Sequence, residues 1–298
     1  MAKTSSITKL DRLRGLEPWA AQQRVYAVQL LESERHTEVV QAALAVLEDQ
    51  PDPEVRPLLL RVYSYFGGEG NRHDSGCYVR SSILRLLRPI SRQEDTALLE
   101  HATAIYESLP PYTGPTRGDV AMGLRGAALV ALSDLDERLA GYHAVRLLVD
   151  PRTSPMSGEP AVSAVQVLAA QGQLLPLYGY LLSGDMGIPD VVAECLRQLT
   201  PIPATLLGAL VERYQQNEDE IVLLGLFDLL LAHQELPAYV NFILDFLRTT
   251  RLLNIYRYLV SAIIAGRHKE MIAALETMVA GERSDQRRLL LQEALALR

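Results

Sequence analysis

The stretch Asp-Pro-Glu-Val-Arg-Pro-Leu-Leu-Leu-Arg-Val-Tyr-Ser-Tyr-Phe at residues 52–66 has the pattern of a helix with one apolar side. Its apolar side chains recur at spacings of three and four residues, which is the helical period. Pro53 stands at the start, where a first-turn proline loses no hydrogen bond of the helix. Gly67 and Gly68 follow as stop signals. We therefore predict a helix over residues 53–66.

Helices of the same kind begin at intervals along the chain. Each is apolar and rich in small residues, with large side chains three to five positions after its start. The starts are Val40-Gln41, Val79-Arg80, Leu124-Arg125, Val162-Ser163, Val191-Val192 and Ile221-Val222. They are 39, 45, 38, 29 and 30 residues apart, a drift typical of helical hairpins joined by unequal loops. Stacked hairpins form an α-solenoid, so we predict an all-α fold and a single continuous α-solenoid domain over residues 1–298.

Paired in order along the chain, the predicted helices form about eight antiparallel hairpins. They are 17–32 with 36–50, 53–66 with 76–88, 92–108 with 118–132, 136–149 with 158–172, 173–183 with 188–200, 203–215 with 217–233, 236–249 with 251–265, and 267–280 with 284–297.

Three of these hairpins have long internal loops, at residues 67–76, 110–118 and 150–159. The corresponding links in the later hairpins are only a few residues long. Equivalent loops of a solenoid emerge along one edge, so we expect the three long loops to be neighbours in space.

An acidic residue precedes or opens the second helix of five hairpins. These residues are Asp74, Asp119, Glu159, Asp190 and Asp219. Acids at a helix start accept hydrogen bonds from free backbone amides and complement the helix dipole. We therefore predict a capping role for each of them.

The Asp-x-x-Val-Arg pattern within residues 52–66 resembles the helix motif of HEAT repeats. The Val-Arg pair recurs as Val79-Arg80 and, more loosely, as Leu124-Arg125. The resemblance holds at motif level over residues 36–132 and as periodicity over most of the chain. It implies a HEAT-like superhelix of antiparallel helix pairs with an extended concave face, which usually holds a protein partner.

The second half of the chain departs from the HEAT motif. The position of the arginine is taken there by Ser163, Val192 and Val222. The later spacing of about 30 residues also suits tetratricopeptide-like hairpins, although the small and aromatic residues of that motif are not in register. In this half the resemblance rests on the period alone.

The composition limits the classes of function. The chain has 29 basic and 36 acidic residues, a formal net charge of −7, and a mean hydropathy of +0.05. This charge argues against a global attraction to nucleic acid. Neither a signal peptide nor a membrane span is recognisable, which predicts a cytoplasmic protein without a membrane partner. Cys77 and Cys195 fall within apolar helices, and we expect buried free thiols.

The surroundings of the first long loop are the strongest candidate for a binding surface. Residues 61–92 contain six arginines and two acidic residues, a local charge of plus four. Arginines and tyrosines near a glycine-rich turn suit a partner or an anion. The candidate partner-binding residues are Arg72, His73, Arg80, Tyr112, Arg117, Arg125 and Arg152. The alternative is that the arginines of the helix at residues 76–88 extend across the solenoid surface and pair with acids of the neighbouring repeat.

Motifs for chemistry are weak. The loop Gly-Gly-Glu-Gly-Asn-Arg-His-Asp-Ser-Gly lacks the Gly-Lys-Ser/Thr ending of a phosphate loop. The six histidines are scattered without metal-ligand spacing, so we expect no metal and no cofactor. Paired carboxylates at Asp74, Asp119 and Glu159 would need the loops to bring them together. We assign no catalytic residue.

These observations favour a bacterial-type HEAT-like binding or scaffold module that holds another protein or peptide. The contact surface is predicted on the concave face and the long-loop edge. An alternative is a nucleic-acid-binding or nucleic-acid-processing HEAT-like enzyme that uses the same edge. A third hypothesis is a subunit of a larger assembly.

Overall fold

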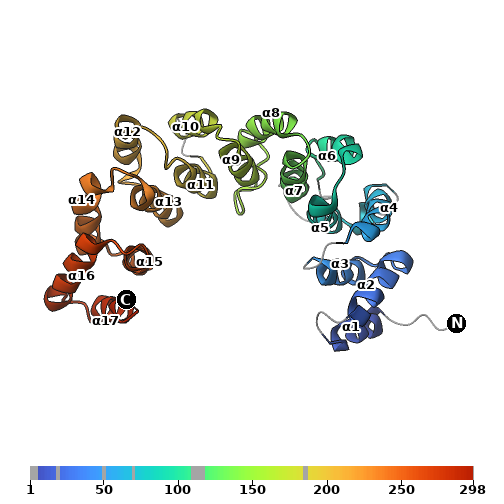
Figure 1. Cartoon of the computed structure of the whole chain (residues 1–298), viewed down its shortest axis with the longest axis horizontal. Helices are drawn as coiled ribbons and strands as arrows, with labels where there is room; N and C mark the ends of the chain where they lie inside the picture. Colours follow the sequence, from blue (N-terminus) through green and yellow to red (C-terminus); the bar gives the residue numbers. More distant parts are fainter. Residues whose placement is uncertain are drawn as a thin grey trace. The chain divides into compact units, whose positions relative to one another are not determined.

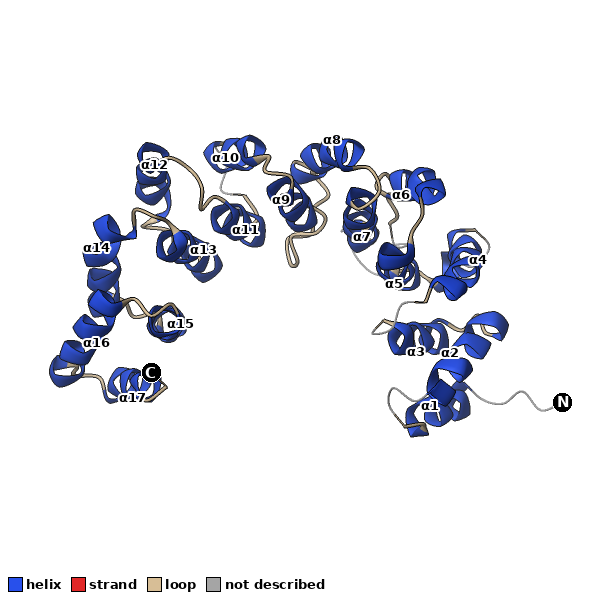
Figure 2. Cartoon of the chain, in the orientation of Figure 1, coloured by secondary structure: helices blue, strands red, loops and turns tan. Residues whose placement is uncertain are grey.

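The structure, a computed structural model, describes residues 6–17, 21–48, 52–68, 71–108, 118–183 and 187–297. Within these residues helices run along most of the chain, and no strand is drawn in Figure 2. The exception is an isolated antiparallel bridge between Ser108 and Asp119. The predicted all-α class is therefore confirmed.

Seventeen α-helices are present in the described residues. They are α1 (Ser6–Gly15), α2 (Ala21–Ser33), α3 (Thr37–Leu47), α4 (Arg56–Gly67), α5 (Tyr78–Leu87), α6 (Thr96–Ala102), α7 (Met122–Ser133), α8 (Glu137–Leu148), α9 (Ala161–Ala170), α10 (Leu174–Leu182), α11 (Pro189–Gln198), α12 (Ala204–Tyr214), α13 (Glu220–Ala232), α14 (Leu236–Thr249), α15 (Leu253–Ala265), α16 (Lys269–Gly281) and α17 (Asp285–Leu295). Four short 3₁₀ helices accompany them: η1 (Pro53–Val55), η2 (Asn71–His73), η3 (Arg88–Ile90) and η4 (Gln93–Asp95).

The helices group into two compact units, Met1–Gly172 and Gln173–Arg298, called unit 1 and unit 2 below. In unit 1 the helices α3, α5, α7 and α9 pack successively on one another, and α2, α4, α6 and α8 flank them (Figure 1). In unit 2 the helices α11, α13, α15 and α17 form the successive row, with α10, α12, α14 and α16 flanking it.

The predicted helices agree with the observed helices to within a few residues at their ends, with two differences. Helix α1 is additional and buries only Leu13. The helix predicted over residues 92–108 is wrong beyond α6, which ends at Ala102. The chain there leaves the helix because the Val120 amide donates to the Glu107 carbonyl and the Glu107 amide donates to Asp119.

Side chains at the helix starts explain several boundaries. Asp136 accepts from the Leu139 amide at the start of α8, and Asp219 accepts from the Ile221 amide at the start of α13. Pro189 occupies the first turn of α11, where its missing N–H costs no hydrogen bond. Gly172, with a φ of +67°, follows α9 in the left-handed conformation that glycine adopts easily.

Candidate functional site

The N-terminal ends of α5, α7 and α9 meet at one edge of unit 1. We call this edge, formed by residues 71–78, 104–108, 118–122 and 150–160, the loop edge. Hydrogen bonds and ion pairs join its segments to one another, as set out below. Asp74 of the first long loop and Asp150 of the third therefore belong to one network, whereas residues 110–117 of the second long loop lie outside the described residues.

Arg80 holds the first part of the loop edge. Its Nε donates to Asp74 Oδ2 at 3.0 Å, and its Nη1 donates to Glu107 Oε1 at 2.6 Å. Asp74 also accepts from the amides of Val79 and Arg80, which caps α5. The guanidinium thus ties the loop before α5 to the segment that follows α6.

Arg125 holds the second part in the same way. Its Nη1 donates to Asp119 and to the Ile105 carbonyl. Its Nη2 lies 3.3 Å from Asp150 Oδ2, within ion-pair distance but without the alignment of a hydrogen bond. The guanidinium carbon lies 4.1 Å from the centroid of the Tyr106 ring. Arg125 therefore links three segments through one buried cation.

The two centres are continuous with each other through Glu107. The Glu107 carboxylate accepts from Arg80, and the Glu107 amide donates to Asp119 Oδ1 at 3.1 Å. The bond from Arg80 lowers the pKa of Glu107 more than its partial burial raises it. Carboxylates and arginines in one network fix the positions of their loops, so the loop edge is a preorganised surface.

Tyr106 and Arg152 form the solvent-exposed side of the network. The Tyr106 hydroxyl donates to Asp150 Oδ2 at 3.0 Å, and the guanidinium carbon of the exposed Arg152 lies 4.9 Å from the centroid of the Tyr106 ring. Burial, followed by the bond to Asp150, raises the pKa of Tyr106. The phenol therefore stays protonated as a hydrogen-bond donor near neutral pH.

The predicted partner-binding residues fall into three groups. Arg72, His73 and Arg152 are exposed on the loop edge. Tyr112 and Arg117 lie outside the described residues. The remaining two, Arg80 and Arg125, are the centres of the internal network.

Arg80 and Arg125 occupy the interior and not the partner-facing surface for which we selected them. They are 1% and 0% exposed. Both cations are already paired with carboxylates, because an unpaired buried charge would be costly. In this structure they hold the loop edge in place. Arg80 pairs with Glu107 of the next hairpin, as the alternative predicts, but it does so from the interior and not across the surface.

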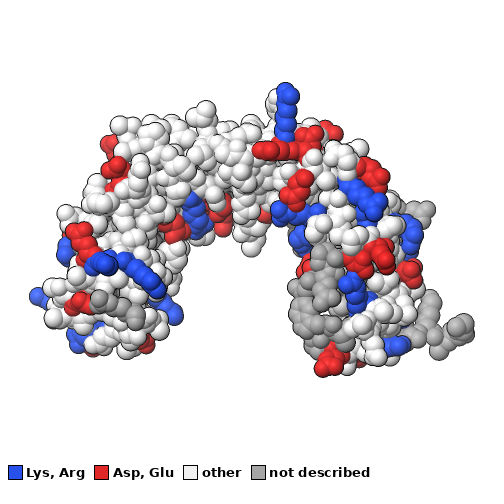
Figure 3. Space-filling view, viewed as in Figure 1, with Lys and Arg blue, Asp and Glu red and all other residues white. Residues whose placement is uncertain are grey.

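Sequence reasoning missed two exposed side chains of the loop edge, Tyr106 and Met156, while Tyr78, one of the tyrosines near the glycine-rich turn, is exposed there as well. A recess of about 450 Å³ at the loop edge is lined by residues that include Ser108, Met122, Arg152 and Ser154. On the face drawn in Figure 3, basic and acidic side chains alternate over α4 to α8, without a field of one sign.

The carboxylates considered for catalysis are engaged separately. Asp74 and Asp119 each bind an arginine, and Glu159 accepts from the Ser163 hydroxyl at 2.8 Å. No group of three or more potential ligands is placed to hold a metal ion in the described part of the chain. The buried Cys77 thiol has its pKa raised to about 12 by burial, which keeps it protonated and unreactive.

Glu159 gives a testable pH dependence. Burial raises the pKa of this carboxyl above its ordinary value of 4.5. The folded chain therefore binds more protons here than the unfolded chain, and stability falls as the pH rises from about 4.5 through the raised pKa. We expect Glu159→Gln to unfold at higher urea concentration than the wild type at pH 7 and at a similar concentration near pH 4. Glu137→Gln, at an exposed position, is the control; an equal effect of both variants at every pH would contradict the assignment.

Comparisons with protein-family models, with curated proteins and with solved structures found no match. In the residues that the structure describes, no helix has both the length and the apolar character that crossing a membrane requires.

Proposed function

We propose that the chain is a HEAT-like α-solenoid that acts as a binding or scaffold module, and that the loop edge of unit 1 contacts its protein partner. The packing of α3, α5, α7 and α9 in succession, with a flanking helix between each pair, supports the solenoid. This is the arrangement that stacked helical hairpins produce.

The observation that carries the proposal is the composition of the exposed loop edge. Tyr78, Tyr106 and Met156 are exposed beside Arg72 and Arg152. Aromatic residues, methionine and arginine are the types enriched where proteins bind one another. The buried network beneath them lowers the entropy lost on binding, because it already holds residues 74, 107, 119 and 150 in place.

The nucleic-acid alternative is weakened by the same structure. Arg80 and Arg125 are neutralised by internal carboxylates, and Arg88 pairs with Asp134 at 2.7 Å. These cations do not contribute a free positive surface for a phosphate backbone. A protein partner remains the better-supported class.

The test is affinity capture by the tagged chain from a lysate of its source cells. We expect the wild type to retain a protein partner in stoichiometric amount. The double variant Met156→Asp, Arg152→Glu should retain at least tenfold less of that partner. The matched control is Leu175→Asp on α10, since Leu175 is 85% exposed and Met156 is 91% exposed. Equal capture by the loop-edge variant, or retention of nucleic acid without protein, would contradict the proposal.

A further inference from the structure

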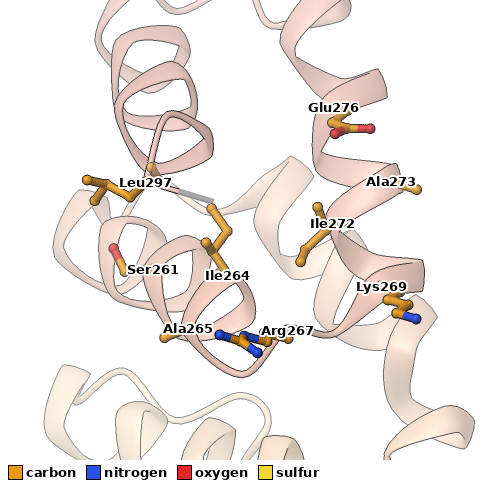
Figure 4. Close-up of a pocket in the computed structure, with 10 residues that line it drawn as sticks. Ser261, Ile264, Ala265, Arg267, Lys269, Ile272, Ala273, Glu276 and Leu297 are labelled. Carbon is orange, nitrogen blue, oxygen red and sulfur yellow. The ribbon is translucent and has the colours of Figure 1, made fainter.

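A groove in unit 2 is separate from the loop edge and is not used by the proposed function. It has a volume of about 780 Å³ and lies between α15, α16 and α17. Figure 4 shows Ile264 of α15 and Ile272 of α16 on its two sides. Its lining is mainly apolar, and its polar members are Ser261, Arg267, Lys269 and Glu276.

The residues along the groove have helical spacing. Helix α16 contributes Lys269, Ile272, Ala273 and Glu276, which are positions i, i+3, i+4 and i+7 of one face. This face extends for about 10 Å along the helix axis. Helix α15 contributes residues at the same three- and four-residue steps, from Ser261 onward. Such rows of side chains leave channels into which the ridges of another helix fit.

Large and small side chains alternate in this groove. Ile264 and Ile272, on the two facing helices, are largely buried, whereas Ala265 and Ala273 are exposed. Leu297 is 84% exposed at the remaining wall. The exposed alanines permit close approach of a second backbone, and the leucine offers apolar area that docking would bury.

Two cations stand at one end of the groove. Arg267 and Lys269 are exposed and form no ion pair with another described residue. Both lie at the start of α16, where the helix dipole adds positive potential. Figure 4 places them at the same end and Glu276 toward the other end of α16. The end that carries Arg267 and Lys269 thus favours an anionic group on the occupant.

We propose that this groove binds an amphipathic α-helix of a partner protein, with apolar residues at i, i+3, i+4 and i+7 and an acidic residue facing Arg267 and Lys269. A helix fits because the groove is lined by two helices whose side chains have the same three- and four-residue spacing. The described residues include no sheet edge that would add an extended strand.

The probe is a display library of 16-residue helix-forming peptides, selected on the whole wild-type chain. We expect enrichment of acidic amphipathic sequences, and for the best of them about a tenfold loss of affinity on Lys269→Glu. An acidic residue at the first turn of α16 suits the helix dipole, so this variant keeps its fold. Arg257→Glu, an exposed position on α15 outside the groove, is the matched control and should leave affinity unchanged.

A second variant tests the shape of the groove. Ala273→Leu fills the groove from an exposed helical position and should abolish binding, while Ala280→Leu on the same helix should not. The proposal would be overturned if no peptide were enriched, or if the enriched peptides lacked acidic residues. It would also be overturned if Lys269→Glu and Ala273→Leu both kept wild-type binding. Self-association of the chain that the same variants abolish would assign the groove to a second copy, and would also overturn it.

Discussion

Arg125→Met is expected to lower the free energy of unfolding of unit 1 by about 3–5 kcal/mol, the range found when one partner of a buried ion pair is removed. The arginine is fully buried and faces Asp119 and Asp150. Methionine fills a similar volume but leaves both carboxylates without their cation. It also removes the hydrogen bond to the Ile105 carbonyl.

Arg152→Met is the matched control for this loss. Arg152 lies over the same Tyr106 ring but is exposed, so its removal should change stability by less than about 0.5 kcal/mol. Adding Asp119→Asn to Arg125→Met should recover part of the loss, because the amide oxygen still accepts hydrogen bonds without a charge. Urea unfolding measures all three, and a loss below about 1 kcal/mol for Arg125→Met would contradict the network.

Gly225→Ala should destabilise unit 2 by about 1–3 kcal/mol, the usual cost of overpacking a core. A Cβ at this position of α13 would lie 2.6 Å from Ala193 Cα and 2.7 Å from the Ala193 carbonyl oxygen. These atoms belong to the backbone of α11 and cannot move aside without separating the two helices. The steric cost exceeds the gain in helix propensity that alanine normally gives over glycine.

For Gly179→Ala in the same unit we expect the opposite effect on stability. A Cβ at this exposed position of α10 would meet nothing within 4 Å. The substitution should therefore stabilise the helix by about 0.5–1 kcal/mol. Thermal unfolding of the two variants separates the effect of close helix packing from the effect of helix propensity. If Gly225→Ala were as stable as Gly179→Ala, α11 and α13 would not approach each other this closely.

The helices were predictable because the period of the apolar residues agrees along the chain with the positions of the proline, glycine and acidic residues at the helix ends. Asp219 illustrates this, since it caps α13 as predicted. Helix α1 was missed because its sequence is polar and buries a single leucine. The early end of α6 was missed because residues 105–108 gain hydrogen bonds from residues far along the chain, which local propensity does not contain.

The interior position of Arg80 was not predicted because charge was counted within a window of sequence. Its partner Glu107 lies outside residues 61–92, as does Asp134, the partner of Arg88. Acids of the next hairpin therefore neutralise part of the apparent patch. One local signal was present: an aspartate six residues before the arginine, in Asp74 and Arg80, recurs in Asp119 and Arg125.

Hydrogen exchange of the chain, free and bound to a captured partner, maps the contact surface without substitutions and so tests whether the loop edge binds the partner. We expect slower exchange on binding at the amides of residues 72–78, 104–108 and 151–158, while the buried amides of α7 change little. Protection confined to unit 2, with the loop edge exchanging as in the free chain, would contradict this expectation.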